Sequence, residues 1–398
     1  MIRGQVLMAL KDDGPLSRIE LARRTSVSPT TMTRIVSQLI DEGIVVDGNT
    51  VSSTGVGRPA TEISLVHDAK VVVGVHILVG LIKVGIIDLF GKVLDSTEFE
   101  YDTGLAAETV IARTAQVVNT LIESSSFEIA DILGIGVAVP GPVDTAGRSI
   151  LLPINLNWRN VPVADLLEPL TELPVTVEHS VQSMALAEAY FGAGSGAESV
   201  AFIYLRAGLG AGIVVNAPLY AGGIRGAIEL GHLHVIDNGA PCVCGSNGCI
   251  ETIVGQNALR AMLEQAGVDP GERGALTALY ESTAENPKAR ELIDEIVAHL
   301  ATAISAVANI MNPEVIFLGG TLGEIPTPLR ERVTTRTREL IFPFMRPRIR
   351  IETSSLGEAS GVIGGGASAL KRFFYSGRER GEHHHVPSGH AMGHALRK

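Results

Sequence analysis

The alternation of apolar strands with helices after Val71 restricts the possible folds of this chain more than any other feature. Residues 71–94 have the pattern of two tightly joined strands, residues 108–125 that of a helix, and residues 131–144 that of a buried strand ending in a Gly/Pro loop. Similar segments follow: a helix over 181–192, a β-hairpin over 199–223, a long helix over 287–311, a strand over 315–320, and a strand with a Gly-rich helix over 348–374. This order predicts an α/β body with two lobes.

The beginning of the chain has a different pattern, in which two short helices precede a third. Residues 3–11 form an amphipathic helix that ends before Asp13, Gly14 and Pro15. Ser17 and, three residues later, Glu20 make a capping box for a second helix through Arg24. Ser28 is a good N-cap for the third helix, because Pro29 then takes the first helical position.

The third helix and the segment after it suit DNA binding. Residues 44–66 read as a hairpin around a Gly-rich tip, so helix, turn, helix and wing occur in order. The polar side of the helix and the wing tip supply the expected DNA contacts, which are Ser28, Thr30, Thr31, Thr33, Arg34 and Arg58. Arg23 and Arg24 are expected to contact phosphates rather than bases. A small helical protein-interaction domain is the alternative.

Charge limits which part of the chain can contact nucleic acid. The net charge is −11, but residues 1–66 hold seven Lys/Arg and seven Asp/Glu, so the remaining 332 residues carry all of it. An acidic body repels DNA, and we therefore expect the neutral head to make the contact.

We also expect a cytoplasmic protein. We find no apolar run long enough to cross a bilayer, and the first residues contain acids and a glycine where a signal peptide needs an apolar stretch. The three cysteines fall within eight residues, and an odd number in a reducing compartment argues against a disulfide framework.

Four segments of the body resemble the motifs of one known family. They are residues 136–144 (GVAVPGPVD), 229–232 (ELGH), 242–251 (CVCGSNGCIE) and 312–320 (NPEVIFLGG). The chain is thereby similar, over nearly its whole length, to the ROK family of repressors, uncharacterised reading frames and sugar kinases. Its winged head resembles the regulator branch. The resemblance implies an actin-like, ribonuclease-H-like body of two lobes, related to hexokinases, that holds a sugar between them.

With this resemblance the chain divides into four parts. Residues 1–67 form a winged helix-turn-helix domain and residues 68–190 a first actin-like lobe. Residues 191–375 form a second lobe with a zinc loop, whose last helix returns to the first lobe. Residues 376–398 are a His-rich tail, expected to be disordered, for which metal binding is the alternative.

Zinc is the expected metal. Cys242, Cys244 and Cys249 lie on one Gly-rich loop, and His232 is ten residues upstream at the end of an expected strand. Three thiolates and an imidazole make a closed tetrahedral set, which is typical of a structural zinc. His234 would share the face of His232 if this segment were a strand. The alternative is three free thiols beside an unrelated histidine.

The family resemblance also implies which residues hold the sugar. They are Gly141, Asn155, Glu178, His179, Glu229, His232 and Glu251. His232 can ligate zinc through one ring nitrogen and use the other for a hydroxyl. His179 stands where the family has an asparagine, and a histidine can still hydrogen-bond a hydroxyl. The alternative for Glu229 and Glu251 is that they are solvated loop residues.

The groups that carry kinase chemistry in the family are replaced here. The family's D-x-G-G-T loop reads as residues 76–80 (HILVG), and its second phosphate cradle as residues 206–212 (RAGLGAG), which lacks the hydroxyl. The catalytic Asp of E-N-D is Ser180, whose hydroxyl cannot act as a carboxylate base. These changes predict a body without kinase activity.

Three functions are compatible with these residues. The favoured one is a repressor whose operator binding responds to a sugar or sugar phosphate through closure of the lobes. A DNA-binding regulator with a vestigial body controlled by a protein partner is the second, and an ATP-dependent sugar kinase is the third. Helix-turn-helix readers usually bind DNA as two-fold assemblies, so a homodimer or homotetramer is expected.

Overall fold

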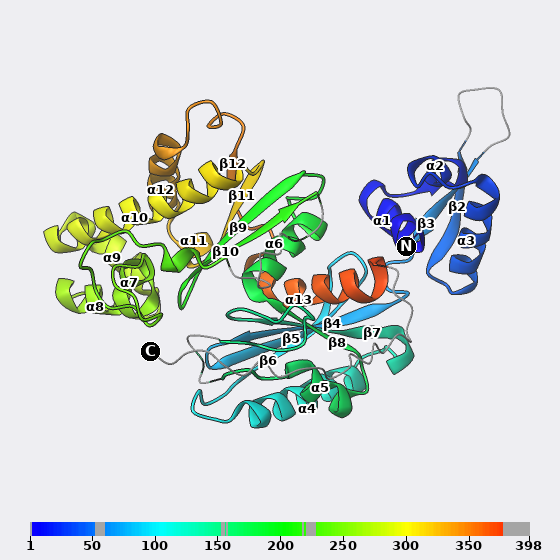
Figure 1. Ribbon diagram of the computed structural model, residues 1–398, viewed down its shortest axis with the longest axis horizontal. Coiled ribbons are helices and arrows are strands. Elements are labelled where there is room, and N and C mark those ends of the chain that lie inside the picture. Colours follow the sequence, from blue (N-terminus) through cyan, green and yellow to red (C-terminus); the bar gives the residue numbers. More distant parts are fainter. Residues whose placement is uncertain are drawn as a thin grey trace, which may run out of the picture.

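The structure is a computed structural model that describes residues 2–51, 60–152, 156, 158–216, 219 and 228–376. Figure 1 shows a small head beside a larger body that is built on two sheets. This arrangement confirms the predicted fold class of a winged head on a two-lobed α/β body. The wing tip with Arg58, the loop with Asn155 and tail residues 377–398 lie outside the described residues.

The head contains three helices and a small sheet. The helices are α1 (Ile2–Asp13), α2 (Arg18–Arg24) and α3 (Pro29–Asp41), and the strands are β1 (Leu16–Ser17), β2 (Val45–Val51) and β3 (Ala60–Leu65). Both predicted caps are confirmed, because Ser17 and Glu20 form a capping box and the Ser28 side chain accepts from the amide of Thr31. Strand β1, which pairs with β3, was missed because two residues show no alternation.

The first body sheet has the strand order β6-β5-β4-β7-β8. Its strands are β4 (Val71–Leu78), β5 (Leu81–Ile87), β6 (Val93–Glu100), β7 (Ile132–Val139) and β8 (Val175–His179). Strands β4, β7 and β8 are parallel, so their carboxyl ends meet at one edge. Helices α4 (Ala107–Ser124) and α5 (Val163–Thr171) lie together on one face of the sheet (Figure 1).

The second body sheet has the order β10-β9-β11-β12. Its strands are β9 (Ser199–Leu205), β10 (Leu209–Val215), β11 (Val315–Gly320) and β12 (Arg350–Thr353). The helices of this lobe are α7 (Glu251–Val254), α8 (Gln256–Ala266), α9 (Ala275–Glu281), α10 (Pro287–Met311), α11 (Thr321–Glu324) and α12 (Thr327–Leu340). The predicted hairpin over β9 and β10 and the helix over residues 287–311 are thus confirmed.

Two helices lie between the sheets, α6 (Ser180–Phe191) and α13 (Ser360–Leu370). The glycines of α13 let it lie directly on the first sheet. A Cβ atom added at Gly136 of β7 would come within 1.9 Å of the Gly365 carbonyl oxygen, and one at Gly74 of β4 within 2.1 Å of that of Val362. Helix α13 therefore packs directly on strands β4 and β7 of the first sheet.

Helix α10 corrects one expectation about membranes. By length and composition alone, Pro287–Met311 is long and apolar enough to cross a bilayer, contrary to the expectation that the chain has no such run. In the structure 56% of its apolar window is buried inside the protein, and the helix packs against α12 and α9. Its hydrophobic face belongs to the core of the second lobe.

Candidate functional site

The polar face of α3 has only a few side chains that are free to reach a ligand. The Ser28 hydroxyl caps the helix and lies 2.9 Å from that of Thr31, while Thr33 donates to the Pro29 carbonyl at 2.9 Å. Thr30 and Arg34 are exposed, and within the described chain neither side chain has a hydrogen bond or ion pair. We therefore expect Thr30 and Arg34 to contribute most to the direct contacts of α3 with DNA.

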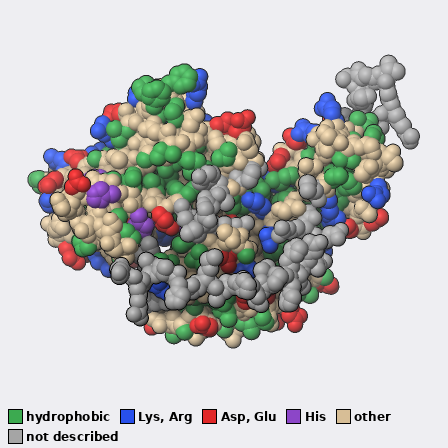
Figure 2. All heavy atoms as spheres, viewed as in Figure 1, with side chains coloured by type: hydrophobic (Ala, Val, Ile, Leu, Met, Phe, Trp, Pro, Cys, Tyr) green, Lys and Arg blue, Asp and Glu red, His purple; other side chains and the backbone are tan. Residues whose placement is uncertain are grey.

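Ion pairs within the head occupy most of its other arginines. The guanidinium of Arg3 binds Glu42 at 2.6 Å, that of Arg18 binds Asp47 at 2.9 Å, and that of Arg24 pairs with Asp13. The pairing of Arg24 weakens the expectation that it contacts a phosphate. In Figure 2 the Lys and Arg side chains of the head appear as separate blue areas rather than as one patch.

The four predicted metal ligands converge in the second lobe. One ligand atom from each of His232, Cys242, Cys244 and Cys249 lies within 4.8 Å of the others. The sulfur atoms of Cys244 and Cys249 are 3.8 Å apart, and the Cys242 sulfur is 3.5 Å from Nδ1 of His232. In a tetrahedral zinc site, bonds of about 2.3 Å to sulfur and 2.0 Å to nitrogen give separations of about 3.8 Å and 3.5 Å. The cluster is therefore the right size for this ion.

The chemistry of the cluster also suits a cation. Burial raises the pKa of Cys249 to about 12, and hydrogen bonds with Cys242 and Cys244 act in the same direction. Such a thiol stays protonated at neutral pH unless a metal ion stabilises the thiolate. Nδ1 of His232 is the ring nitrogen on the sulfur side, which leaves Nε2 for a second partner.

The local structure around His232 corrects the sequence analysis. His232 ends a 3-10 helix, Leu230–His232, and not a strand. The alternation argument for His234 therefore fails. The ring of His234 instead lies 2.8 Å from the carbonyl oxygen of Asn247 and 3.2 Å from the carboxylate of Asp237, and so supports the cysteine loop from outside. The apolar–polar spacing of this segment resembles that of a strand, but His234 forms only an isolated β-bridge with Cys249.

Two of the predicted sugar ligands lie beside the metal cluster. Glu229 is an exposed residue, but the protein atoms packed around its carboxylate raise its pKa. The charge of His232 lowers this pKa, and the nearby carboxylate of Glu251 raises it. The carboxylate of Glu251 accepts from the amide of Leu209 at 3.4 Å. Added Cβ atoms at Gly208 and Gly231 would lie 2.1 Å and 2.9 Å from that carboxylate. Both glycines thus make room for the carboxylate of Glu251. This packing accounts for a glycine at position 208 without a bound phosphate.

The other predicted sugar ligands lie at the edge of the first sheet. Val139 of β7 is in register with His179 of β8, so the loop after β7, with Gly141 at φ 78°, begins beside His179. Glu178 and His179 are both buried, and the Glu178 carboxylate accepts from the amide of His179 at 3.2 Å. Nδ1 of His179 is buried, and among the described residues it has no hydrogen-bond partner. A buried polar atom of this kind suits a ligand hydroxyl.

His76 occupies the place of the acidic residue in the family's phosphate loop, and it is closed off from solvent. The side chain is 4% exposed, and an added Cβ at Gly361 would lie 2.0 Å from its Nδ1. Burial, together with the positive charges of Lys83 and Arg206, lowers the pKa of His76 to about 3. A neutral imidazole packed against α13 cannot hold a metal ion in the way that a carboxylate at this position would.

The pKa of His76 predicts a loss of stability in acid. Its folded pKa, about 3, lies below the unfolded value of 6.5, so the unfolded chain binds more protons as the pH falls below 6.5. This difference in proton binding lowers the free energy of unfolding by roughly 2 kcal/mol at pH 5. Between pH 7 and pH 5 we therefore expect the free energy of unfolding of His76→Leu to fall by roughly 2 kcal/mol less than that of the wild type. Urea unfolding at both pH values measures this, and equal losses would refute it.

Comparison with known proteins now adds to this geometry. The model of the ROK family matches residues 72–372, and a winged helix-turn-helix DNA-binding model matches residues 2–46. The chain belongs to the ROK family. Within this family, the glucokinase of Halalkalibacterium halodurans is 30% identical over 307 residues, 74% of this chain and 93% of its own length.

Two ROK regulators align with the head as well as the body. The DNA-binding transcriptional repressor Mlc of Escherichia coli is 24% identical over 384 residues, 94% of this chain and 93% of its own. The crystal structure of a ROK family transcriptional regulator, a homologue of E. coli Mlc, is 25% identical with a TM-score of 0.80 and covers 94% of this chain and 96% of that one. The two-domain arrangement is therefore that of ROK regulators.

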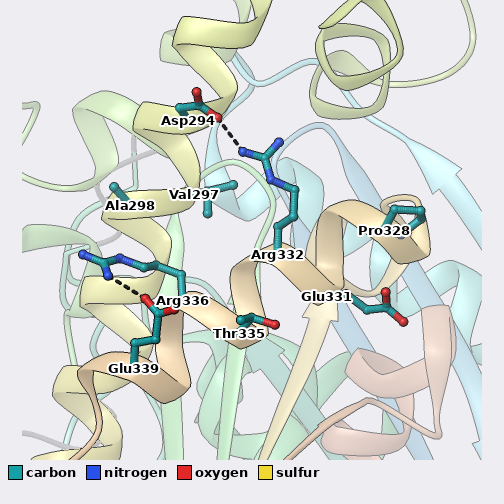
Figure 3. Close-up of a pocket in the computed structure, with 9 residues that line it drawn as sticks. All are labelled: Asp294, Val297, Ala298, Pro328, Glu331, Arg332, Thr335, Arg336 and Glu339. Atoms are coloured by element: carbon teal, nitrogen blue, oxygen red, sulfur yellow. Dashed lines mark hydrogen bonds and ion pairs between the residues drawn. The ribbon is translucent and has the colours of Figure 1, made fainter. Parts of the chain in front are cut away.

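A surface groove lies elsewhere on this ROK body, between α10 and α12. It has a volume of about 430 Å³, and none of its lining residues is a predicted ligand. Figure 3 shows Arg332 turned toward Asp294 and Arg336 turned toward Glu339, at distances of 2.5 Å and 2.6 Å. Both of these cations are already paired with carboxylates, and we assign the groove no function.

Proposed function

We propose that this ROK protein is a DNA-binding transcription regulator, most simply a repressor, whose operator binding changes when a sugar or sugar derivative binds its body. The observation that carries the proposal is the winged head joined to a full ROK body, an arrangement shared with Mlc over more than nine-tenths of both chains. Thr30 and Arg34 would contact the operator from α3, with Arg58 reaching from the wing. The protein would act as a two-fold assembly in the cytoplasm.

The sugar would lie between the two sheets. Gly141 and Asn155 would flank it on the first lobe, Glu178 and His179 would bind it from the end of β8, and Glu229, His232 and Glu251 from the second lobe. The buried, unpartnered Nδ1 of His179 supports this placement. Zinc held by His232 and the three cysteines would be structural, because four protein ligands fill its tetrahedron. It would fix the loop that carries Glu251.

We infer that the body does not phosphorylate the sugar. Ser180 begins α6 where the family's kinases have a catalytic Asp, and the buried His76 replaces the acid of the phosphate loop. Loss of a positioned base alone costs on the order of a hundredfold or more in rate. The carboxylates of Glu178, Glu229 and Glu251 and the imidazole of His232, which would bind hydroxyls, are retained, and this favours sensing over catalysis.

DNA binding at low salt tests the proposal. Fluorescence anisotropy with DNA from upstream of the protein's own gene should give submicromolar affinity, which falls as salt is added. A thermal-shift screen should then find a sugar that stabilises the protein and changes that affinity. The proposal fails if the protein ignores such DNA, and its sensing part fails if it turns over ATP with glucose or another sugar at the rate of an ordinary kinase.

A further inference from the structure

The side chain of Lys11 joins the DNA-binding head to the body. It lies near the end of α1, yet only 3% of it is exposed. Its ammonium group donates to the Tyr190 carbonyl at 2.8 Å and lies 5.2 Å and 5.5 Å from the ring centres of Tyr190 and Phe191. The carboxylate of Asp12 is 2.5 Å away. A buried ammonium is costly without such partners, so they restrict where α1 can lie.

The connection between head and body is held at the same place. Residues 66–70 are all that separates β3 from β4. The ring of His67 stacks on Phe90 with centres 3.9 Å apart, and the His67 carbonyl accepts from the amide of Leu89 at 3.0 Å. The Tyr375 hydroxyl in turn donates to the Leu89 carbonyl at 2.8 Å. One hydrophobic cluster includes residues of both head and body, so the head is docked rather than loosely tethered.

Helix α6 connects this docking site to the space between the lobes. Tyr190 and Phe191 end the helix, and His179 immediately precedes it, about 18 Å away for a helix of this length. The carboxylate of Glu188, which is fully buried, accepts from the Ser354 hydroxyl at 2.6 Å and from the Ser355 amide at 2.9 Å, in the loop after β12. The contact of α6 with the second lobe and its contact with the head thus both lie in the last turn of the helix.

We propose that α6 sets the orientation of the DNA-binding head and that Lys11 is the positioning residue through which it does so. A change in the angle between the lobes would displace the loop after β12, and Glu188 would carry that displacement into α6. The Lys11 contact with Tyr190 and Phe191 passes it to α1, and so to α3. The inference rests on the proposed function, because only a DNA-binding head gives this connection a use.

Hydrogen–deuterium exchange of the full-length protein tests the connection without effector or DNA. Lys11→Met keeps an unbranched side chain but removes the charge, and we expect the amides of α1 to exchange about tenfold faster. Arg3→Met is the matched control, because Arg3 lies on the same helix but binds Glu42 within the head. In this control α1 should exchange as in the wild type, and α3 should be unchanged in both variants. An unchanged α1 in Lys11→Met would overturn the docking role.

A double-mutant cycle tests the transmission through α6. Glu188→Gln, or Ser355→Ala on the other side of the same contact, should speed exchange of α1 about fivefold, although both lie in the body. In a Lys11→Met background the same substitution should add nothing. The proposal would be overturned if the substitution sped exchange of α1 equally in the wild-type and Lys11→Met backgrounds, or if it had no effect in the wild-type background.

Two further outcomes are separable. If Lys11→Met does not fold, Phe191→Leu removes one aromatic face of the same contact, and α1 should then exchange about threefold faster; an unchanged rate again overturns the proposal. A wild-type protein that fails to bind DNA but passes the cycle would refute the proposed function and leave the connection between α6 and the head intact.

Discussion

Replacing Cys249 with serine is expected to abolish zinc binding, from one ion per chain to near zero, and to destabilise the second lobe by about 3 kcal/mol or more. The reason is that Cys249 is the one fully buried ligand, and its sulfur lies 3.8 Å from that of Cys244. Without the ion the remaining thiols would protonate and the loop carrying Glu251 would lose its anchor. Metal analysis of the purified protein, with urea unfolding, measures both effects.

His234→Ala is the matched control for the zinc site. His234 is the histidine closest in sequence to His232, but its ring contacts Asn247 and Asp237 rather than the sulfurs. This variant should keep one zinc per chain, whereas His232→Ala should lose it. Full metal content in Cys249→Ser, or loss of metal in His234→Ala with retention in His232→Ala, would show that the ligand set is wrong.

Arg34→Ala should weaken operator binding by roughly tenfold to a hundredfold, the effect of about 1–3 kcal/mol for one arginine contact. Arg34 is exposed on the polar face of α3, and in the described part of the chain no carboxylate pairs with it. Its charge is therefore available to DNA without first breaking an ion pair. Anisotropy titrations at two salt concentrations measure the loss.

The salt dependence separates two roles for this arginine. If Arg34 contacts a phosphate, the slope of log affinity against log salt should fall by about one unit and all sequences should be affected alike. If it reads a base, the variant should lose preference for the operator over unrelated DNA. Arg3→Ala, whose guanidinium already binds Glu42, should change affinity less than about threefold. Wild-type affinity in Arg34→Ala would remove α3 as the reading helix.

Local signals were strong enough to predict most elements of this protein. Capping residues such as Ser17 and Ser28, and the break at Asp13-Gly14-Pro15, act within one turn of chain, so they fixed the helices of the head. Strands β4, β7 and β11 of the body could be read because each is buried along most of its length. The spacing of the three cysteines likewise restricted the metal to one loop.

Other features were decided only when distant segments came together. His232 ends a 3-10 helix because the ELGH segment packs around the carboxylate of Glu251 and against Leu209 of β10, without pairing as a strand of that sheet. Gly208 looked like the remnant of a phosphate cradle, yet its missing side chain makes room for Glu251.

The sequence by itself determined the winged head, the two-lobed body and the ligand types of the candidate metal cluster, because each depends on residues close together along the chain. The tertiary structure decided how the head is attached. A lysine in the last turn of an amphipathic helix is normally solvated, and only the approach of Tyr190 and Phe191, some 180 residues farther along, buries Lys11. Contacts between residues this far apart leave no periodic or local trace in the sequence.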